Sequence, residues 1–208
     1  MSGDGIAAII SAIGVIIIGY MRYNQHRHNK LIDIKAKKLE AQLERKSTRR
    51  SENSARVYGE IHHLLNALGC DRVFIIQPHP LGDNHYLSVL YEVTANRISR
   101  ISEFFQDLKM SEIPKFSSMM AKNEYSLIRS IDELDGTRAK ALFSSNGTKA
   151  MIVQRLSDTV HDWVGSLICD YTVGLPENMD PVETMKTLHF AAMHIQYILP
   201  EVSEKKCV

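Results

Sequence analysis

The sequence has few cysteines and none of the short motifs that mark the common enzyme classes. Its 208 residues include three cysteines, Cys70, Cys169 and Cys207, without a CxxC pair or a regular spacing. That usage is typical of reduced, mostly buried thiols and not of a disulfide framework. The sequence also contains no glycine-rich phosphate loop, no GxSxG stretch and no HExxH stretch. We therefore expect a protein that is not an enzyme.

Charge is absent from one long stretch near the N-terminus. The sixteen residues Ile6–Met21 carry no charged side chain, and as a helix they would span about 24 Å. With Gly5, Tyr20 and Tyr23 as interfacial flanks, the helix would just reach across a thin hydrocarbon core of about 27 to 30 Å. A cleaved signal peptide would need a basic segment before the apolar run, where the only charged side chain is Asp4. A buried helix would need a surrounding core, which the residues that follow do not offer. The stretch predicts an uncleaved transmembrane helix over residues 6–21, after a short extracytoplasmic N-terminus over residues 1–5.

Basic residues follow this predicted helix. Arg22, Arg27 and Lys30 crowd its C-terminal end, whereas its N-terminal end has a single acid. The positive-inside rule places the N-terminus outside and the rest of the chain in the cytoplasm. We therefore expect a single-pass protein of the plasma membrane or an inner membrane.

Residues 22–53 have the composition of a basic helical stalk. Residues 22–50 hold ten Lys or Arg and three Asp or Glu, a net charge of +7, whereas residues 51–208 hold fifteen and twenty, a net charge of −5. A coiled-coil pattern recurs at spacings of four, three and four residues, at Ile32, Ala36, Leu39 and Leu43. Because so short a pattern pairs weakly alone, we expect a homodimer whose seam continues into the next helix through Val57, Ile61 and Leu64.

The basic charge of the stalk has two interpretations. Beside a bilayer, it would attract anionic lipid headgroups. Nucleic-acid binding is the alternative, but no aromatic residue lies between Asn24 and Val57 to stack on a base. We expect a membrane partner and no nucleic acid.

Residues 54–199 have the pattern of a globular domain, and residues 200–208 form a tail. Gly69 favours the left-handed conformation that ends a helix, and Pro181 favours a first helical turn. The predicted elements, in order, are a helix that ends before Gly69, strands over 70–79 and 85–94, a helical segment over 98–108, a strand over 125–131, a short helix over 135–143, strands over 149–157 and 163–173, and a helix over 181–199.

This order resembles the GAF family of cytoplasmic sensor domains. The stretches that carry the resemblance are CDRVFIIQPH (70–79) and KAMIVQRLSDTVHDWVGSLICDYTV (149–173), which looks like the final GAF hairpin. PAS domains are the runner-up, but they usually lack long helices at both ends. The resemblance implies an α+β fold in which a six-stranded antiparallel sheet carries the terminal helices, often paired in a dimer, on one face and a ligand pocket on the other. The sequence lacks an NKFDE-like set for cyclic nucleotides and a middle-segment cysteine for a bilin, so any cofactor stays unknown.

The implied pocket would lie under the segment from Phe104 to Tyr125. Its ligand-facing part would be the run Phe116–Met120, although Met and Phe are also common in plain cores. Arg155 would bind a ligand anion or lie solvated at a sheet edge, and Ser166 would share a face with Val164 and Ile168. The candidate ligand-binding residues are therefore Phe104, Phe116, Ser118, Met119, Tyr125, Arg155 and Ser166.

A second cluster, His79, Asp83 and His85, lies on a predicted hairpin loop. Imidazole and carboxylate groups are metal ligands, but a site needs a fourth ligand. Because such clusters on loops are usually solvated turns, we expect no metal.

These features lead to two hypotheses for function. The first is a membrane-anchored sensor in which a bound small molecule shifts the packing of the terminal helices and signals through an unidentified protein partner. The second is a ligand-free adaptor, or structural module, that holds a protein partner at the membrane.

Overall fold

The computed structural model describes residues 3–80, 85–158 and 162–199 of the chain. Within residues 3–36 it describes the side chains of Met21 and Lys35 only. The chain divides into two compact units, Met1–Arg50 and Ser51–Val208, which are described separately.

The described residues of the first unit all lie in helix α1 (Gly3–Leu68), which has 66 residues and continues into the second unit. Each described side chain of this unit is exposed, and Leu39 and Leu43 are each 59% exposed. No helix within the described residues is both long enough and apolar enough to cross a membrane. The side chains of residues 6–20, of Ile32 and of Ala36 lie outside the described residues. The membrane anchor and the stalk seam therefore stay predictions.

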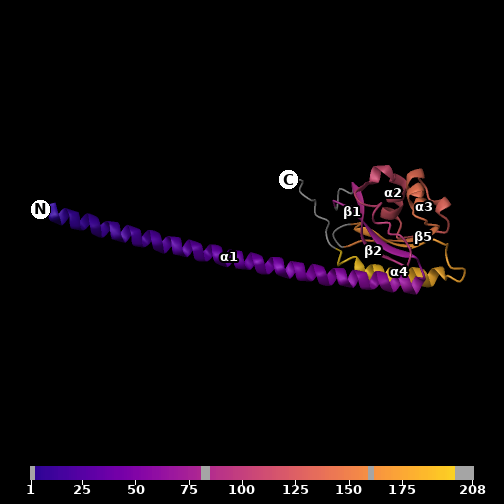
Figure 1. The fold of residues 1–208 in the computed structure, drawn as a ribbon, viewed down its shortest axis with the longest axis horizontal. Coiled ribbons are helices and arrows are strands. Elements are labelled where there is room, and N and C mark those ends of the chain that lie inside the picture. Colours follow the sequence, from indigo (N-terminus) through magenta and orange to yellow (C-terminus); the bar gives the residue numbers. More distant parts are fainter. Residues whose placement is uncertain (1–2, 81–84, 159–161, 200–208) are drawn as a thin grey trace. The chain divides into compact units, whose positions relative to one another are not determined.

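The second unit is built on a six-stranded antiparallel sheet with the strand order β3-β2-β1-β6-β5-β4 (Figure 1). The strands are β1 Arg72–His79, β2 Tyr86–Thr94, β3 Leu108–Lys109, β4 Tyr125–Ile128, β5 Ala150–Leu156 and β6 Gly165–Tyr171. The helices of this unit are the end of α1, α2 Pro114–Lys122, α3 Thr137–Ser145 and α4 Pro181–Ile195. Two short 3-10 helices, η1 Met110–Glu112 and η2 Ile131–Glu133, complete the described elements. The predicted α+β fold with a six-stranded antiparallel sheet is confirmed.

Both faces of the sheet are buried at its centre. Consecutive residues of β1 and β6 are buried, and successive side chains of a strand point to opposite faces. Figure 1 shows the end of α1 and α4 on one side of the sheet, and α2 and α3 on the other. On the first side, His194 Nδ1 lies 3.0 Å from Glu60 Oε1, so α4 and the end of α1 lie side by side. Gly69 ends α1 in the left-handed conformation, with φ of 59°, as predicted.

The predicted continuation of a dimer seam through Val57, Ile61 and Leu64 is wrong. All three side chains have no exposed surface, because they pack in the core between α1, α4 and the sheet of a single chain. A side chain buried in this way contributes nothing to a contact with another chain. Any pairing of this domain must therefore use other residues.

Residues 98–108 do not form the predicted helix. The Glu92 carboxylate accepts a hydrogen bond from the Ile101 N–H at 2.7 Å, and the Phe105 carbonyl oxygen accepts one from the Val89 N–H at 2.8 Å. These bonds hold the segment along strand β2, and its last residue begins the short edge strand β3. Tertiary contacts thus override the helical spacing of the apolar residues.

A buried ion pair joins the two central strands. Arg72 on β1 and Asp170 on β6 have no exposed side-chain surface, and Arg72 Nε donates to Asp170 Oδ2 at 2.6 Å. Arg72 Nη2 also donates to the Asn146 carbonyl oxygen and to Thr148 Oγ1, each at 3.0 Å, and Nη1 donates to the Ser99 carbonyl oxygen at 3.2 Å. Burial raises the pKa of Asp170 to about 6, against the opposing effects of Arg72 and Thr148. The carboxylate therefore depends on the guanidinium to stay ionised.

We expect Arg72→Met to lower the free energy of unfolding by about 3 to 5 kcal/mol, because it leaves a buried charge without a partner. The deficit should shrink as the pH falls from about 7 to about 5. The pKa of Asp170 in the folded state already lies above its unfolded value, and it should rise further without Arg72. The free energy that the variant loses by burying an ionised carboxylate is therefore present at high pH, and this loss disappears once the carboxyl is protonated in both proteins. Chemical denaturation followed by circular dichroism at several pH values measures both effects.

Arg138→Met is the matched control, because Arg138 forms an exposed ion pair with Glu112. It should change stability by less than about 1 kcal/mol at each pH. The double variant Arg72→Met with Asp170→Leu should recover most of the loss, since it removes both charges. Equal losses for Arg72→Met and Arg138→Met would contradict the role given to the buried pair.

Candidate functional site

The face of the sheet under α2 and α3 is where the predicted pocket should lie. Apolar side chains fill it. The Phe143 ring of α3 contacts both Phe105 and Phe116, with ring centroids 5.1 Å apart in each case. Below these rings lie side chains of the central strands, among them Phe74, Ile76, Met151, Val153 and Ile168. This layer is a packed core, and two small hollows formed by described residues lie at its margins.

One hollow lies beside α2 and is called the α2 hollow below. It has a volume of about 180 Å³ and is lined by Lys115, Phe116, Met119, Ile128, Glu133, Leu134 and Asp135. Its lining combines apolar side chains with charged ones. Lys115 Nζ lies 3.5 Å from Asp135 Oδ1, and both of these side chains are mostly exposed. The α2 hollow is therefore a shallow apolar site with a charged rim.

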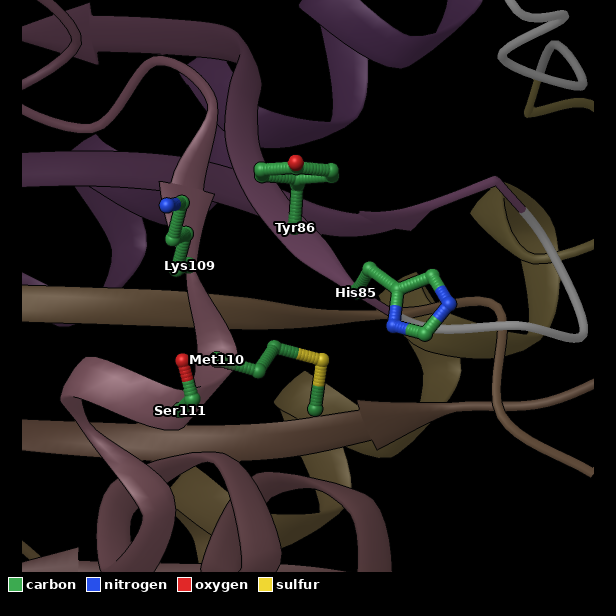
Figure 2. Close-up of a pocket in the computed structure, with 5 residues that line it drawn as sticks. All are labelled: His85, Tyr86, Lys109, Met110 and Ser111. Carbon is green, nitrogen blue, oxygen red and sulfur yellow. The ribbon is translucent and has the colours of Figure 1, made fainter.

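A second hollow, of about 230 Å³, lies at the edge of the sheet formed by β2 and β3 (Figure 2). It is lined by His85, Tyr86, Lys109, Met110 and Ser111. Figure 2 shows the Met110 side chain pointing toward His85 and the Lys109 side chain pointing away from it, so the Lys109 ammonium and the His85 ring do not converge. The Tyr86 ring stacks on His79, whose Nε2 lies 2.9 Å from Ser88 Oγ and 3.3 Å from Asp107 Oδ1.

The volumes of these hollows limit what they can hold. Pockets for drug-sized ligands measure about 300 to 1,000 Å³, and both hollows are smaller. A compact ligand or a single side chain fits the α2 hollow. A larger ligand placed between α2, α3 and the sheet would have to displace the rings of Phe105, Phe116 and Phe143, which contact each other.

Two of the seven predicted ligand residues, Phe116 and Met119, line the α2 hollow. Ser118 lies on the exposed side of the same helix, and Phe104 is 55% exposed. Tyr125 lies on the opposite face of the sheet, where it packs against the α1–α4 core, and burial raises its pKa. The seven residues therefore do not form one site.

Arg155 and Ser166 do pair across β5 and β6, as neighbours in register. Arg155 Nη2 lies 2.7 Å from Asp162 Oδ1, and Ser166 Oγ accepts a hydrogen bond from Trp163 Nε1 at 3.2 Å. Local partners thus occupy Arg155 Nη2 and Ser166 Oγ, whereas Arg155 Nε is buried without a hydrogen-bond partner among the described residues.

Sequence reasoning missed the floor and rim of the α2 hollow, namely Lys115, Ile128, Leu134 and the acids beside them. Lys115 and Met119 are four residues apart on α2, a spacing that places them on one side of a helix. That spacing was the available signal. Nothing in the sequence linked α2 to Leu134.

The metal candidates do not form a site in the part of the chain that the structure describes, where no group of three or more ligating side chains occurs. Asp83 itself lies outside the described residues.

Comparisons with known proteins bear on the fold. No family model and no curated protein sequence matches the chain. Among solved structures, the blue-light-absorbing form of the Thermosynechococcus elongatus PixJ GAF domain matches with a TM-score of 0.57 at 13% identity, over 73% of this chain and 87% of that one. A far-red cyanobacteriochrome photoreceptor matches with 0.53 at 11% identity, over 77% and 95%. The phycoerythrobilin-bound GAF domain of a cyanobacterial phytochrome matches with 0.50 at 12% identity, over 73% and 92%.

These matches lie well below the identity at which a ligand or an activity can be transferred. They do cover nearly the whole of each neighbour. The domain in the second unit of this chain therefore has the GAF fold, as its sequence predicted.

Proposed function

We propose that the chain is a membrane-anchored signalling module whose GAF-fold domain acts by protein contact. Its solved neighbours include photoreceptors and bilin-bound GAF domains, which supports a role in signalling. The packed face under α2 and α3 favours contact with proteins over the binding of a large cofactor. Of the two hypotheses from the sequence, this proposal is the adaptor.

The observation that carries the proposal is that α4 has two apolar faces. One face packs on the sheet through Leu188, Ala191, Ala192 and Ile195, which are at most 4% exposed. The other, called the outer face of α4 below, presents Val182, Met185, Phe190 and Met193, which are 42 to 66% exposed. A surface helix needs one apolar stripe to pack on its own domain. A second stripe favours a protein partner.

A second copy of this chain is the partner that the outer face of α4 fits best. A two-fold contact brings the same patch of both copies together, so the apolar side chains of the outer face would meet each other, with the exposed Lys186 and His189 of the same face beside them. The stalk adds exposed Leu39 and Leu43, spaced for a coiled coil. We therefore expect a homodimer, held by the outer face of α4 and by the stalk.

Phe190→Lys combined with Met193→Lys should convert the dimer to a monomer. The change places four positive charges at a two-fold contact and removes apolar burial of roughly 1.5 to 3 kcal/mol per side chain. The fold should survive, because both side chains are exposed in the single chain. Sedimentation equilibrium of the full chain in density-matched detergent gives the oligomeric state, and circular dichroism gives the fold.

Val173→Lys is the matched control, since Val173 is 91% exposed but lies in the turn after β6. It should leave the dimer intact. Leu39→Asp with Leu43→Asp tests the stalk separately and should weaken the dimer. A wild-type chain that is monomeric at tens of micromolar would rule out the dimer.

Membrane anchoring rests on the apolar stretch over residues 6–21. We expect the full chain to stay with membranes through high-salt and alkaline carbonate washes, because headgroup attraction is lost under those conditions and an inserted helix is not. Val15→Arg with Ile17→Arg should release it, at a cost to insertion of about 2.5 to 3.5 kcal/mol per arginine. Release of the wild-type chain by carbonate would refute the anchor.

A small-molecule receptor is the second candidate, favoured by the α2 hollow with Phe116 and Met119 in its lining. Native mass spectrometry of the full chain released from detergent distinguishes the two. A co-purifying mass that disappears in Met119→Lys would favour the receptor. The bare chain mass, with an intact dimer, is the result that the adaptor predicts.

A further inference from the structure

Strand β4 forms one edge of the sheet. It pairs with β5 and lies last in the strand order. Edge strands present backbone N–H and C=O groups that can pair with another chain unless they are covered. Tyr125, Ser126 and Leu127 of this strand are each only half-buried.

The register shows which backbone groups point outward. The Arg155 N–H of the β5 side donates to the Glu124 carbonyl oxygen at 2.9 Å. Because hydrogen-bonded pairs alternate along an antiparallel ladder, Ser126 and Ile128 bond toward β5, and Tyr125 and Leu127 point away from it. Outside that ladder, no backbone hydrogen bond recorded for the described residues involves Tyr125 or Leu127.

The α2 hollow adjoins this edge. Ile128 is the last residue of β4 and also lines the hollow, together with Phe116, Met119 and Leu134. Side chains of an added strand alternate between the two faces of the sheet. One of them would therefore lie on the α2 side of the sheet, beside Ile128.

Volume and charge specify the occupant. A hollow of about 180 Å³ is below the range of small-molecule pockets and suits one apolar side chain. Its rim carries one cation, Lys115, and two carboxylates, Glu133 and Asp135. That balance favours a basic residue next to the apolar one.

We propose that the β4 edge and the α2 hollow together bind an extended segment of another protein by strand addition, with one apolar side chain in the hollow and a basic residue at its rim. The inference rests on the proposed function, since it names the kind of partner that the module holds. Backbone bonds to Tyr125 and Leu127 supply affinity, and the hollow supplies selectivity.

The probe is a phage-displayed library of random dodecapeptides, selected against the full chain in detergent. The enriched peptides should lack proline in the binding stretch and carry Leu, Ile, Met or Phe beside Lys or Arg. Synthetic copies should slow hydrogen exchange at the Tyr125 and Leu127 amides. A library without enriched binders, or binders that leave these amides unprotected, would overturn the inference.

Two variants with matched controls locate the contact. Leu127→Pro removes an outward N–H without breaking the ladder with β5, as proline does on edge strands. It should weaken peptide binding at least tenfold. Leu127→Thr keeps the N–H and should bind the peptide as the wild type does. Met119→Lys places a charge in the hollow and should also weaken binding at least tenfold. Ser118→Lys, on the exposed side of α2, should have no effect.

Unfolding midpoints of all four variants show whether the fold is retained. If Leu127→Pro does not fold, the peptide affinity of Met119→Lys alone tests the inference. Wild-type affinity in both Leu127→Pro and Met119→Lys would overturn the inference. Sedimentation of the same samples separates it from the proposed function. A dimer that binds no peptide would contradict strand addition at β4 but not the α4 dimer. A monomer that binds peptide would contradict the α4 dimer but not strand addition at β4.

Discussion

The buried Arg72–Asp170 pair is the constraint on which the arrangement of the domain depends. It joins the two central strands where β1 begins and β6 ends, and the other guanidinium donors reach Ser99 and Asn146 in segments far apart in the sequence. Two charges without exposed surface are stable only when each keeps its partner. The pairing of β1 with β6 is therefore costly to change at this end of the two strands.

The two faces of the sheet differ in what covers them. Aromatic rings around Phe143 fill the face under α2 and α3. On the other face, α1 and α4 seal the core with one stripe each, and α4 keeps a second apolar stripe outside. Because the described residues on this face pack closely, we propose that the domain recognises its partners through a helix surface and a strand edge.

Much of this fold could be predicted from local patterns, because apolar alternation, the cap at Gly69 and the start at Pro181 act over a few residues. What failed depended on distant partners. Residues 98–108 follow β2 because of Glu92, which no helical spacing reveals. Val57 and Ile61 have the spacing of a coiled coil and pack instead on their own sheet. The α2 hollow could not be predicted, since Leu134 reaches it only in the folded chain.

The strand edge and the outer face of α4 are linked through β5 and the core beneath α4. Tyr125 and Leu127, whose backbones point outward at the edge, turn their side chains into the α1–α4 core. His189 of α4 lies 3.8 Å from Glu124, the residue before β4. A segment added to β4 would fix the same two residues against which α4 packs. Binding at the edge can therefore favour one arrangement of α4 on the sheet over another. The bound segment then shifts the monomer–dimer equilibrium to the extent that its affinity differs between the two arrangements.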